Sequence, residues 1–179
     1  MVTVSVPLYK CRVPSTCSTF QRCRQKIDVV FEPAEAKPGQ TVTLKINIVL
    51  TDGYHTYPVT QPAEEARFSA NKITFPTTGS ILYVGETVDP VLPKTKKEQD
   101  YELLYYPGGG TWLRKAVVLP NAKPGTSVSK VSIKLLICDK DNCFPPKTFD
   151  TEATLKILDA PAVTVEPRYA AAVEKALKK

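Results

Sequence analysis

The chain has 179 residues, of which 42% are hydrophobic and 23% charged, enough for one globular domain with a sizeable core and arms. The net charge of +6 comes from scattered lysines, with no dense basic run interleaved with aromatics, so we expect no nucleic-acid partner. No apolar run approaches the roughly 18 residues of a membrane span. The start, Met-Val-Thr-Val-Ser-Val-Pro, lacks the basic and long apolar regions of a signal peptide.

Residues 1–26 are expected to form an N-terminal arm, because Ser, Thr, Arg and Cys mix there without a clear period. Cys11, Cys17 and Cys23 recur every six residues, which matches no zinc-binding spacing. An arm disulfide, or simple thiols, is therefore favoured over a metal site. Because the chain has five cysteines, at least one has no partner within it.

Regular structure is predicted to begin at 26–31 and to follow a pattern of short strands. The turn signal Pro38-Gly39 precedes residues 42–50, in which apolar and polar side chains alternate as in a half-buried strand. The same device recurs at Pro124-Gly125, before the alternating stretch 131–137. A further alternating stretch occupies 149–157, so these segments predict long strands on a common core.

Weaker strand candidates lie between these segments, separated by prolines and by a glycine run. They are 66–69, 72–76, 80–84, 101–106 and 112–119. Seven to nine short strands with little helical periodicity predict an all-β fold, an immunoglobulin-like two-sheet sandwich over residues 27–160. The Cys-Trp-Cys spacing of antibody domains is absent, and Trp112 is expected to serve core or loop packing.

The last segment, residues 161–179, changes character and predicts a short C-terminal helix. Tyr169, Val173 and Leu177 recur every four residues among charged neighbours, which is the pattern of an amphipathic helix. We interpret it as a packing tail or a linker, in preference to a helix that binds a membrane surface.

Cys138 and Cys143 are the pair on which a functional interpretation depends. Four turn-forming residues, Asp-Lys-Asp-Asn, separate them, so they are expected to face each other across a hairpin at a distance that a disulfide spans. Because Ile137 continues the inward phase of its strand, Cys138 is predicted to lie on the outer face. A ring of about six residues contributes only about 2 kcal/mol in the loop-entropy model, against nearly 5 for about 100 residues. This favours a redox pair over a structural staple.

Other uses of this loop are less well supported by the residues. Asp139 and Asp141 resemble part of a calcium loop, but its glycine and distal glutamate are missing. A metal site or a cysteine nucleophile would need further ligands or a base, and His55 is the sole histidine. We therefore expect no metal and no organic cofactor.

Two segments together resemble the N-terminal periplasmic domain of the thiol:disulfide interchange protein DsbD family. One is 138–146, Cys-Asp-Lys-Asp-Asn-Cys-Phe-Pro-Pro, with two cysteines followed by an aromatic and Pro-Pro. The other is 53–58, Gly-Tyr-His-Thr-Tyr-Pro, which is similar to the family's segment beside the disulfide. The resemblance covers roughly 27–158. It departs from the family in its four-residue loop, where the best-known members have five, and in the cysteine-rich arm.

The resemblance implies an immunoglobulin-like domain in the periplasm, as a mature or excised form. Its disulfide would receive electrons from a thioredoxin-like domain fed through a membrane-embedded partner. It would pass them to a periplasmic disulfide isomerase or a cytochrome c maturation thioredoxin, as one component of a protein-disulfide reductase system. The membrane and thioredoxin-like parts are not in this sequence, so the chain would be a fragment tethered to a membrane domain or a stand-alone relative.

The resemblance also assigns roles to residues of the two segments. Cys143 would form mixed disulfides, and Cys138 would resolve them. The side chains expected to contact partners are Tyr54, His55, Tyr57, Phe144, Pro145, Tyr101 and Tyr105. Strand-edge packing is the alternative for the two tyrosines at 54 and 57, and His55 is expected to be a polar surface residue without an acid–base role.

A mobile cap loop shields the disulfide in the family, and its counterpart is expected within 100–106. The family's cap phenylalanine is missing there, so a tyrosine or leucine would serve instead. The alternative is that 101–106 is merely a strand. The rival for the whole chain is a redox-inert interaction module whose disulfide only pins a hairpin.

Overall fold

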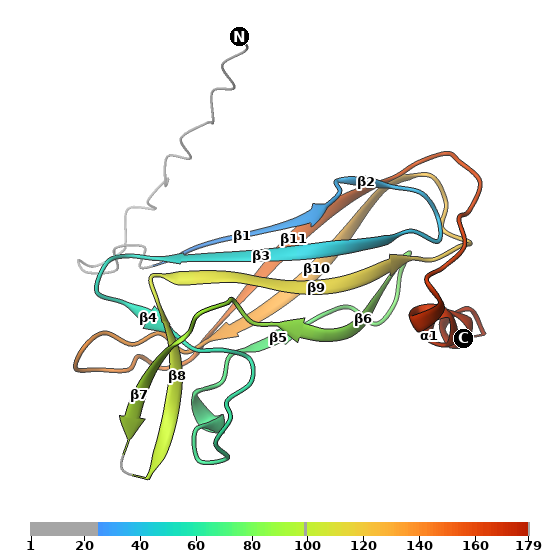
Figure 1. Cartoon of the computed structure of the whole chain (residues 1–179). Coiled ribbons are helices and arrows are strands. Elements are labelled where there is room, and N and C mark those ends of the chain that lie inside the picture. The colour runs from blue at the N-terminus through green and yellow to red at the C-terminus, as the bar shows by residue number, and fades with distance from the viewer. Residues whose placement is uncertain (1–24, 99, 179) are drawn as a thin grey trace, which may run out of the picture.

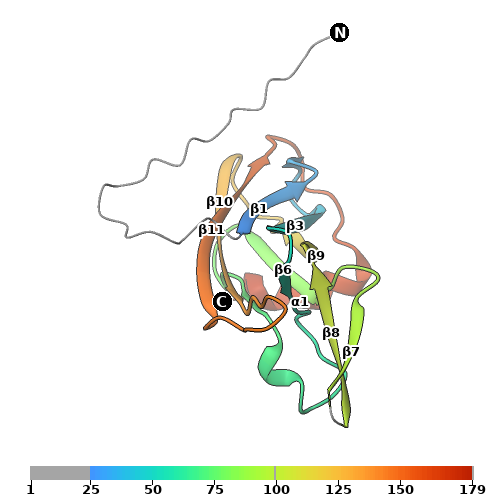
Figure 2. The same ribbon diagram turned by 90° about the vertical axis from the view of Figure 1, so that its left-hand side faces the viewer.

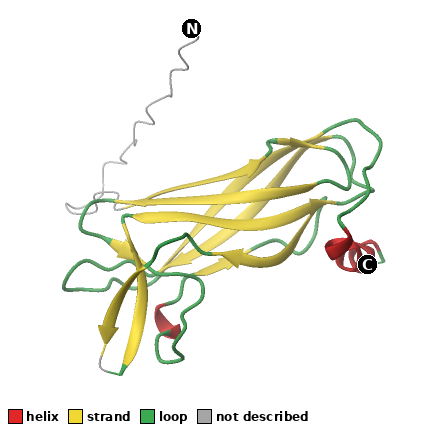
Figure 3. Cartoon of the chain, in the orientation of Figure 1, coloured by secondary structure: helices red, strands yellow, loops and turns green. Residues whose placement is uncertain are grey.

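The computed structural model describes residues 25–98 and 100–178. Within them, two four-stranded sheets pack face to face (Figures 1 and 2). The first sheet has the order β1 (Gln25–Glu32), β3 (Thr41–Leu50), β9 (Gly109–Val118) and β6 (Ile81–Val88). The second has the order β2 (Glu35–Ala36), β11 (Lys147–Ile157), β10 (Gly125–Leu135) and β5 (Lys72–Thr74). Strands dominate the described chain (Figure 3), so the predicted all-β sandwich is confirmed.

The alternating segments of the sequence supply the core between the two sheets. In β3 the inward side chains Leu44, Ile46 and Ile48 are all but fully buried, and β10 contributes Ile133 and Leu135 in the same way. This burial is the main stabilising contribution, because each such side chain adds about 1.5–3 kcal/mol on leaving water. The predicted inward phase of 42–50 and 131–137 is therefore confirmed.

Trp112 of β9 lies in this core with no exposed surface, which confirms its expected packing role. Its ring meets that of Tyr106 edge to face, at 5.6 Å between centroids. Its Nε1–H donates to Asp89, at 2.7 Å. Close by, Gly109 opens β9 with φ of +93°, and a Cβ there would lie 2.0 Å from the Ile48 carbonyl oxygen. Glycine is therefore required for β9 to approach β3.

A small third sheet projects from one end of the sandwich (Figure 1). It has the order β4 (His55–Thr56), β8 (Tyr101–Pro107) and β7 (Lys94–Glu98). The strand predicted at 101–106 is confirmed as β8. Its partner β7 was not predicted, because Lys-Thr-Lys-Lys-Glu has no apolar alternation and four of its five side chains are exposed.

One strand prediction is wrong. Residues 66–69 contain the 3₁₀ helix η1 (Arg67–Ser69) in place of a strand, because Ser69 turns back to donate to the Ala66 carbonyl, at 2.6 Å. The other weaker candidates are strands with shifted ends. The strand predicted at 112–119, for example, begins earlier, because Gly109 and Gly110 of the glycine run already belong to β9.

The C-terminal helix is confirmed as α1 (Pro167–Leu177), and it lies at the opposite end of the sandwich from β4 (Figure 1). Val173 is 3% exposed and packs with Val84 and Val117, whereas Leu177 remains 43% exposed. No helix among the described residues is long and apolar enough to cross a membrane. The arm cysteines at 11, 17 and 23 lie outside the described residues, and β1 already begins at Gln25.

Candidate redox-active disulfide site

Cys138 and Cys143 form a disulfide across a hairpin, as predicted. Their Cα atoms lie 4.0 Å apart, and their backbones form an antiparallel bridge. The Asp139 carboxylate accepts the backbone N–H groups of Asp141 and Asn142, at 2.9 and 2.7 Å. This side-chain turn fixes the four-residue loop, which explains why Asp begins it.

The disulfide hairpin is joined to the third sheet through β4. The backbones of His55 and Cys138 exchange two hydrogen bonds, at 2.9 and 3.0 Å, and His55 is also paired with Pro107 of β8. The paired segments therefore run without interruption from β7 through β8 and β4 to Cys138 and then to Cys143. The cysteines lie at the end of this row, so Cys143 is its outermost member.

The two sulfurs differ sharply in exposure. Cys143 is exposed, whereas Cys138 is 1% exposed. The prediction that Cys138 lies on an outer face is therefore wrong. The prediction that its side chain points away from the sandwich core is correct. Ile137 enters the sandwich core and Cys138 points the other way, but that side is covered by a second apolar cluster. The cluster contains Leu103 from β8, a contact from a distant part of the sequence.

Tyr57 covers the buried sulfur with a polar atom. It is 4% exposed, and its hydroxyl donates to Cys138 Sγ at 3.1 Å and lies 3.8 Å from Cys143 Sγ. Burial raises the pKa of Tyr57, and the charge of Glu98 raises it further. The side chain is therefore a neutral phenol at pH 7, able to donate this hydrogen bond.

His55 stands behind Tyr57. Its Nε2 lies 3.2 Å from the Tyr57 hydroxyl oxygen, and its ring meets those of Tyr57 and Tyr105 edge to face, at 5.5 and 5.1 Å between centroids. Burial lowers the pKa of His55, as does Lys96, while Asp139 opposes the shift. The expectation of a polar surface residue is corrected, because the ring is half-buried among aromatics.

The remaining predicted side chains fall into two groups. Tyr101 and Tyr105 are half-buried against the same cluster as Leu103 and Cys138. Tyr54 and Phe144 form a separate pair, with ring centroids 6.0 Å apart, and Tyr54 packs against the sandwich core. Pro145 is exposed beside them. Their roles in binding partners stay predictions.

Sequence reasoning missed a buried polar contact that holds β4 against the cysteine strand. The Asn71 side chain accepts the Leu136 N–H at 3.1 Å and donates to Thr56 Oγ1 at 2.9 Å and to the Tyr57 carbonyl. Thr56 Oγ1 in turn donates to the Leu136 carbonyl, at 2.8 Å. A single Asn between short strands gives no signal in one sequence, because its partners lie 15 and 65 positions away.

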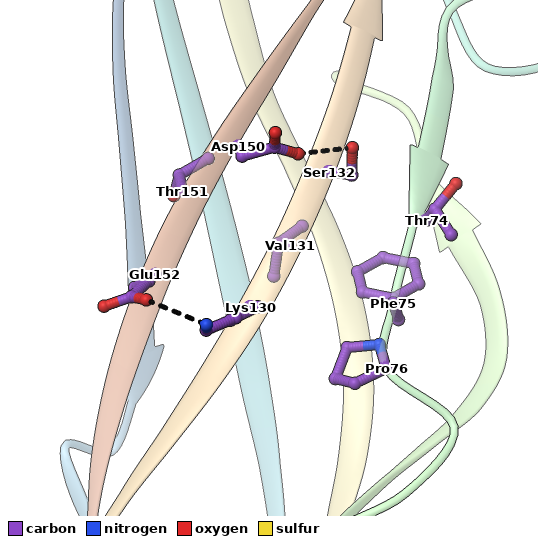
Figure 4. A pocket seen from close by; sticks show the side chains of 9 residues that line it. All are labelled: Thr74, Phe75, Pro76, Lys130, Val131, Ser132, Asp150, Thr151 and Glu152. Carbon is purple, nitrogen blue, oxygen red and sulfur yellow. Dashed lines mark hydrogen bonds and ion pairs between the residues drawn. The ribbon is translucent and has the colours of Figure 1, made fainter.

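Elsewhere among the described residues, we find fewer side chains arranged for binding or catalysis. No three His, Cys, Asp or Glu side chains of residues 25–98 and 100–178 gather as metal ligands. A groove on the second sheet is lined by β10, β11 and the end of β5, where Phe75 and Pro76 follow the strand (Figure 4). Its polar groups pair with each other, as in Ser132 with Asp150 at 2.7 Å, and its lining includes no cysteine.

No protein-family model matches the sequence, and no curated protein matches it either. A solved structure with the same fold is the N-terminal periplasmic domain of ScsB from Proteus mirabilis, a DsbD-like protein. The TM-score is 0.50 at 15% identity, covering 88% of this chain and 55% of that one. This chain and that domain share one fold. A PapD-like domain of human CEP192 also aligns, at a TM-score of 0.32 and 12% identity over 89% of this chain and 98% of that one.

This likeness confirms the resemblance drawn from the two sequence segments at the level of the fold. The present chain spans about half the length of the ScsB structure, and the identity is low. The chemistry of the site must therefore be argued from this chain's own residues.

Proposed function

We propose that the chain is a periplasmic thiol–disulfide exchange domain that passes electrons from a thioredoxin-like donor to periplasmic disulfide acceptors. The observation that carries the proposal is the asymmetry of the Cys138–Cys143 pair. One sulfur is exposed, and the other is buried under a hydrogen-bonding phenol. A structural disulfide does not need sulfurs of unequal exposure, whereas thiol–disulfide exchange needs one sulfur within reach of a partner's thiolate.

The asymmetry supports separate roles for the two sulfurs in this proposal. A donor thiolate attacks the exposed Cys143 Sγ, and the leaving sulfur is Cys138 Sγ, which is packed with Tyr57 and Leu103. In the second half-reaction the Cys143 thiolate attacks an acceptor disulfide, and Cys138 resolves the mixed disulfide. The ring closes only a short hairpin loop, so it opens without disturbing the main core.

The proposed partners are a thioredoxin-like donor domain and, as acceptors, a periplasmic disulfide isomerase or a cytochrome c maturation thioredoxin. The periplasmic location of the ScsB domain supports this assignment. Phe144 and Pro145 follow Cys143 in the chain, and Tyr101 and Tyr105 are half-buried against the cluster that contains Cys138. A partner docked on the exposed sulfur would contact these side chains.

The experiment is the reduction potential of the Cys138–Cys143 pair, measured with Cys11, Cys17 and Cys23 changed to Ser. A value between about −180 and −270 mV is expected, as in exchange-active proteins. A value below about −300 mV would identify a structural bridge and favour the redox-inert interaction module.

Trapping with a thioredoxin-like protein tests the roles of the two sulfurs. Cys138→Ser is expected to accumulate a mixed disulfide through Cys143, because the resolving thiol is gone. Cys143→Ser is expected to form none and to keep its fold. A mixed disulfide formed through Cys138 in the second variant would reverse the assignment.

A further inference from the structure

Three polar atoms form a chain from a half-buried ring to the buried sulfur. His55 Nε2 lies 3.2 Å from Tyr57 Oη, and Tyr57 Oη lies 3.1 Å from Cys138 Sγ. A disulfide sulfur carries no hydrogen, so the Tyr57 proton is the one that occupies the second contact. The phenol oxygen then accepts from His55, which places a hydrogen on Nε2.

Opening of the disulfide needs a group that can stabilise or protonate the buried sulfur, and these atoms can supply one. When the disulfide opens, Cys138 Sγ leaves with an electron pair at a position that is 1% exposed. A charge buried away from water is costly unless it is hydrogen-bonded or neutralised. Tyr57, itself 4% exposed, is the side chain that the structure places on this sulfur.

We propose that Tyr57 delivers a proton to Cys138 when the disulfide is reduced and removes it when the disulfide re-forms, and that His55 exchanges this proton with solvent. Tyr57 touches a reacting atom and is the catalytic residue. His55 acts through Tyr57 and is a positioning residue that also titrates. The inference rests on the proposed exchange function and names the acid–base group of that site.

The reduction step balances as follows. A thiolate of the partner dithiol bonds to Cys143 Sγ, and the Cys138–Cys143 bond breaks with its electron pair going to Cys138. Tyr57 gives its proton to that sulfur and takes one from His55 Nε2, which is replenished from solvent. The partner's second thiolate then bonds to its own first sulfur and releases Cys143 as a thiolate. The partner is oxidised by two electrons, and this pair is reduced.

The return step reverses the path of the proton. Cys143 thiolate attacks one sulfur of an acceptor disulfide. The acceptor S–S bond breaks, its other sulfur leaves as a thiolate, and the attacked sulfur forms a mixed disulfide with Cys143. The Cys138 thiol gives its proton to Tyr57, which passes one to His55. The Cys138 thiolate attacks Cys143 Sγ, the intramolecular disulfide re-forms, and the acceptor leaves as a thiolate.

Charged groups on β7 and on the cysteine hairpin act on this proton relay from Cys138 through Tyr57 to His55. Lys96 of β7 faces His55 and, with burial, lowers its pKa, whereas Asp139 of the cysteine hairpin raises it. Glu98 of β7 acts on Tyr57, and Tyr105 of β8 contributes a neighbouring ring. Because the pKa of His55 is below the ordinary 6.5, its cationic form becomes populated only as the pH falls below that value.

The test is single-turnover reduction of the disulfide by excess dithiothreitol between pH 5 and pH 9, with Cys11, Cys17 and Cys23 changed to Ser. Rates are divided by the concentration of dithiothreitol thiolate, which removes the reagent's own ionisation. The wild-type rate is expected to rise as the pH falls below about 6.5. His55→Gln keeps an N–H near Tyr57 without titrating, so it should lose this rise and react roughly 10- to 100-fold more slowly at pH 5.

Tyr57→Phe should show the same loss, because it breaks the chain at its centre. Tyr169→Phe, which removes a phenol on α1 at the far end of the molecule, is the matched control and should follow the wild-type profile. A wild-type pH profile in folded His55→Gln, checked by circular dichroism, overturns the relay. A normal relay profile with dithiothreitol, combined with no exchange with a thioredoxin-like protein, supports the relay and refutes the proposed partner class instead.

Discussion

Asn71 shows how one buried side chain sets the geometry of the disulfide site. It is 4% exposed, and its amide contacts Thr56 and Tyr57 of the β4 segment on one side and Leu136 on the other. Leu136 is two positions before Cys138, and Tyr57 carries the hydroxyl that meets the sulfur. The amide therefore sets the spacing between the hydroxyl and the sulfur, because buried hydrogen bonds hold their partners in fixed positions.

Replacing Asn71 with Ala is expected to destabilise the protein by about 3 kcal/mol, because buried backbone and hydroxyl groups lose their partner. The free energy of unfolding from urea denaturation measures this. Asn47→Ala is the control, since Asn47 accepts a hydrogen bond from Thr111 at an exposed position. Its effect should stay within about 0.5 kcal/mol. Equal effects of the two substitutions would contradict the structural role assigned to Asn71.

At the scale of elements, the β7–β8 hairpin is the cover of the buried cysteine. Leu103 of β8 is 8% exposed and packs in the cluster that contains Cys138. The hairpin is held by Gln61, whose side-chain amide donates to the Leu104 carbonyl at 2.9 Å and accepts the Leu104 N–H at 3.1 Å. A glutamine side chain thus takes the place of a neighbouring strand at this position.

Gln61→Ala is expected to loosen this cover. The Leu104 amide should exchange with deuterium faster, and dithiothreitol should reduce the disulfide several-fold faster, because the β7–β8 hairpin opens more often. Amide exchange and the reduction rate are the measurements. Gln40→Ala is the matched control, because the Gln40 side chain accepts the exposed Lys37 N–H and lies outside the β7–β8 hairpin. An unchanged Leu104 amide would show that the rest of β8 holds the hairpin.

Asp89 joins three segments at the base of the same hairpin. Its carboxylate accepts the Val59 N–H and the Trp112 Nε1–H, each at 2.7 Å. Burial raises the pKa of Asp89, although these hydrogen bonds oppose the shift. The charge of Asp89, after burial, also helps to raise the pKa of Tyr106 to about 12.

The raised pKa of Asp89 gives a pH dependence of stability with a defined sign. The folded protein binds the proton more tightly than the unfolded chain, so this contribution is complete below the unfolded value of 3.8 and is lost as the pH rises through the folded pKa. Relative to Asp89→Asn, the wild-type free energy of unfolding should therefore fall between pH 3 and pH 6. Urea midpoints at the two pH values measure it. A difference that is constant with pH would contradict the raised pKa.

The elements that the sequence predicted well are those whose signal is local. Residues 42–50, 131–137 and 149–157 alternate over most of their length, and all three supply long strands of the sandwich, although β10 ends at Leu135. The hairpin between Cys138 and Cys143 was likewise predictable, because turn formers and a fixed spacing determine it. β7 and η1 were not, since their conformations depend on pairing with β8 and on the packing of Ala66.

The environment of the site was harder to predict for the same reason. The direction in which the Cys138 side chain points follows from the alternation of its strand. Its burial depends on Leu103 and Tyr57, which are distant from it in the sequence. His55 was expected on the surface because nothing local indicates the rings of Tyr57 and Tyr105 around it. Long-range contacts of this kind require the sheet order, which a single sequence does not provide.

At the scale of the whole molecule, the two ends of the sandwich have separate packing. The disulfide lies in the cluster with Tyr57 and Leu103, whereas α1 packs at the opposite end through Val173 (Figure 1). The main core lies between these two clusters and shares neither set of side chains. Changes at one end should therefore add to, and not alter, changes at the other.

Val173→Ala tests this separation. The substitution leaves a small cavity against Val84 and Val117 and is expected to lower the free energy of unfolding by about 2 kcal/mol. The reduction potential of Cys138–Cys143 should not change, because no side chain of the α1 cluster belongs to the disulfide cluster. Tyr57→Phe, in contrast, is expected to shift the reduction potential of Cys138–Cys143, because it removes the hydrogen bond to Cys138. Urea denaturation and equilibrium with glutathione, applied to both variants and to the double variant, measure the two quantities. A shift of the potential in Val173→Ala would show that the helix end and the disulfide end are coupled through the core.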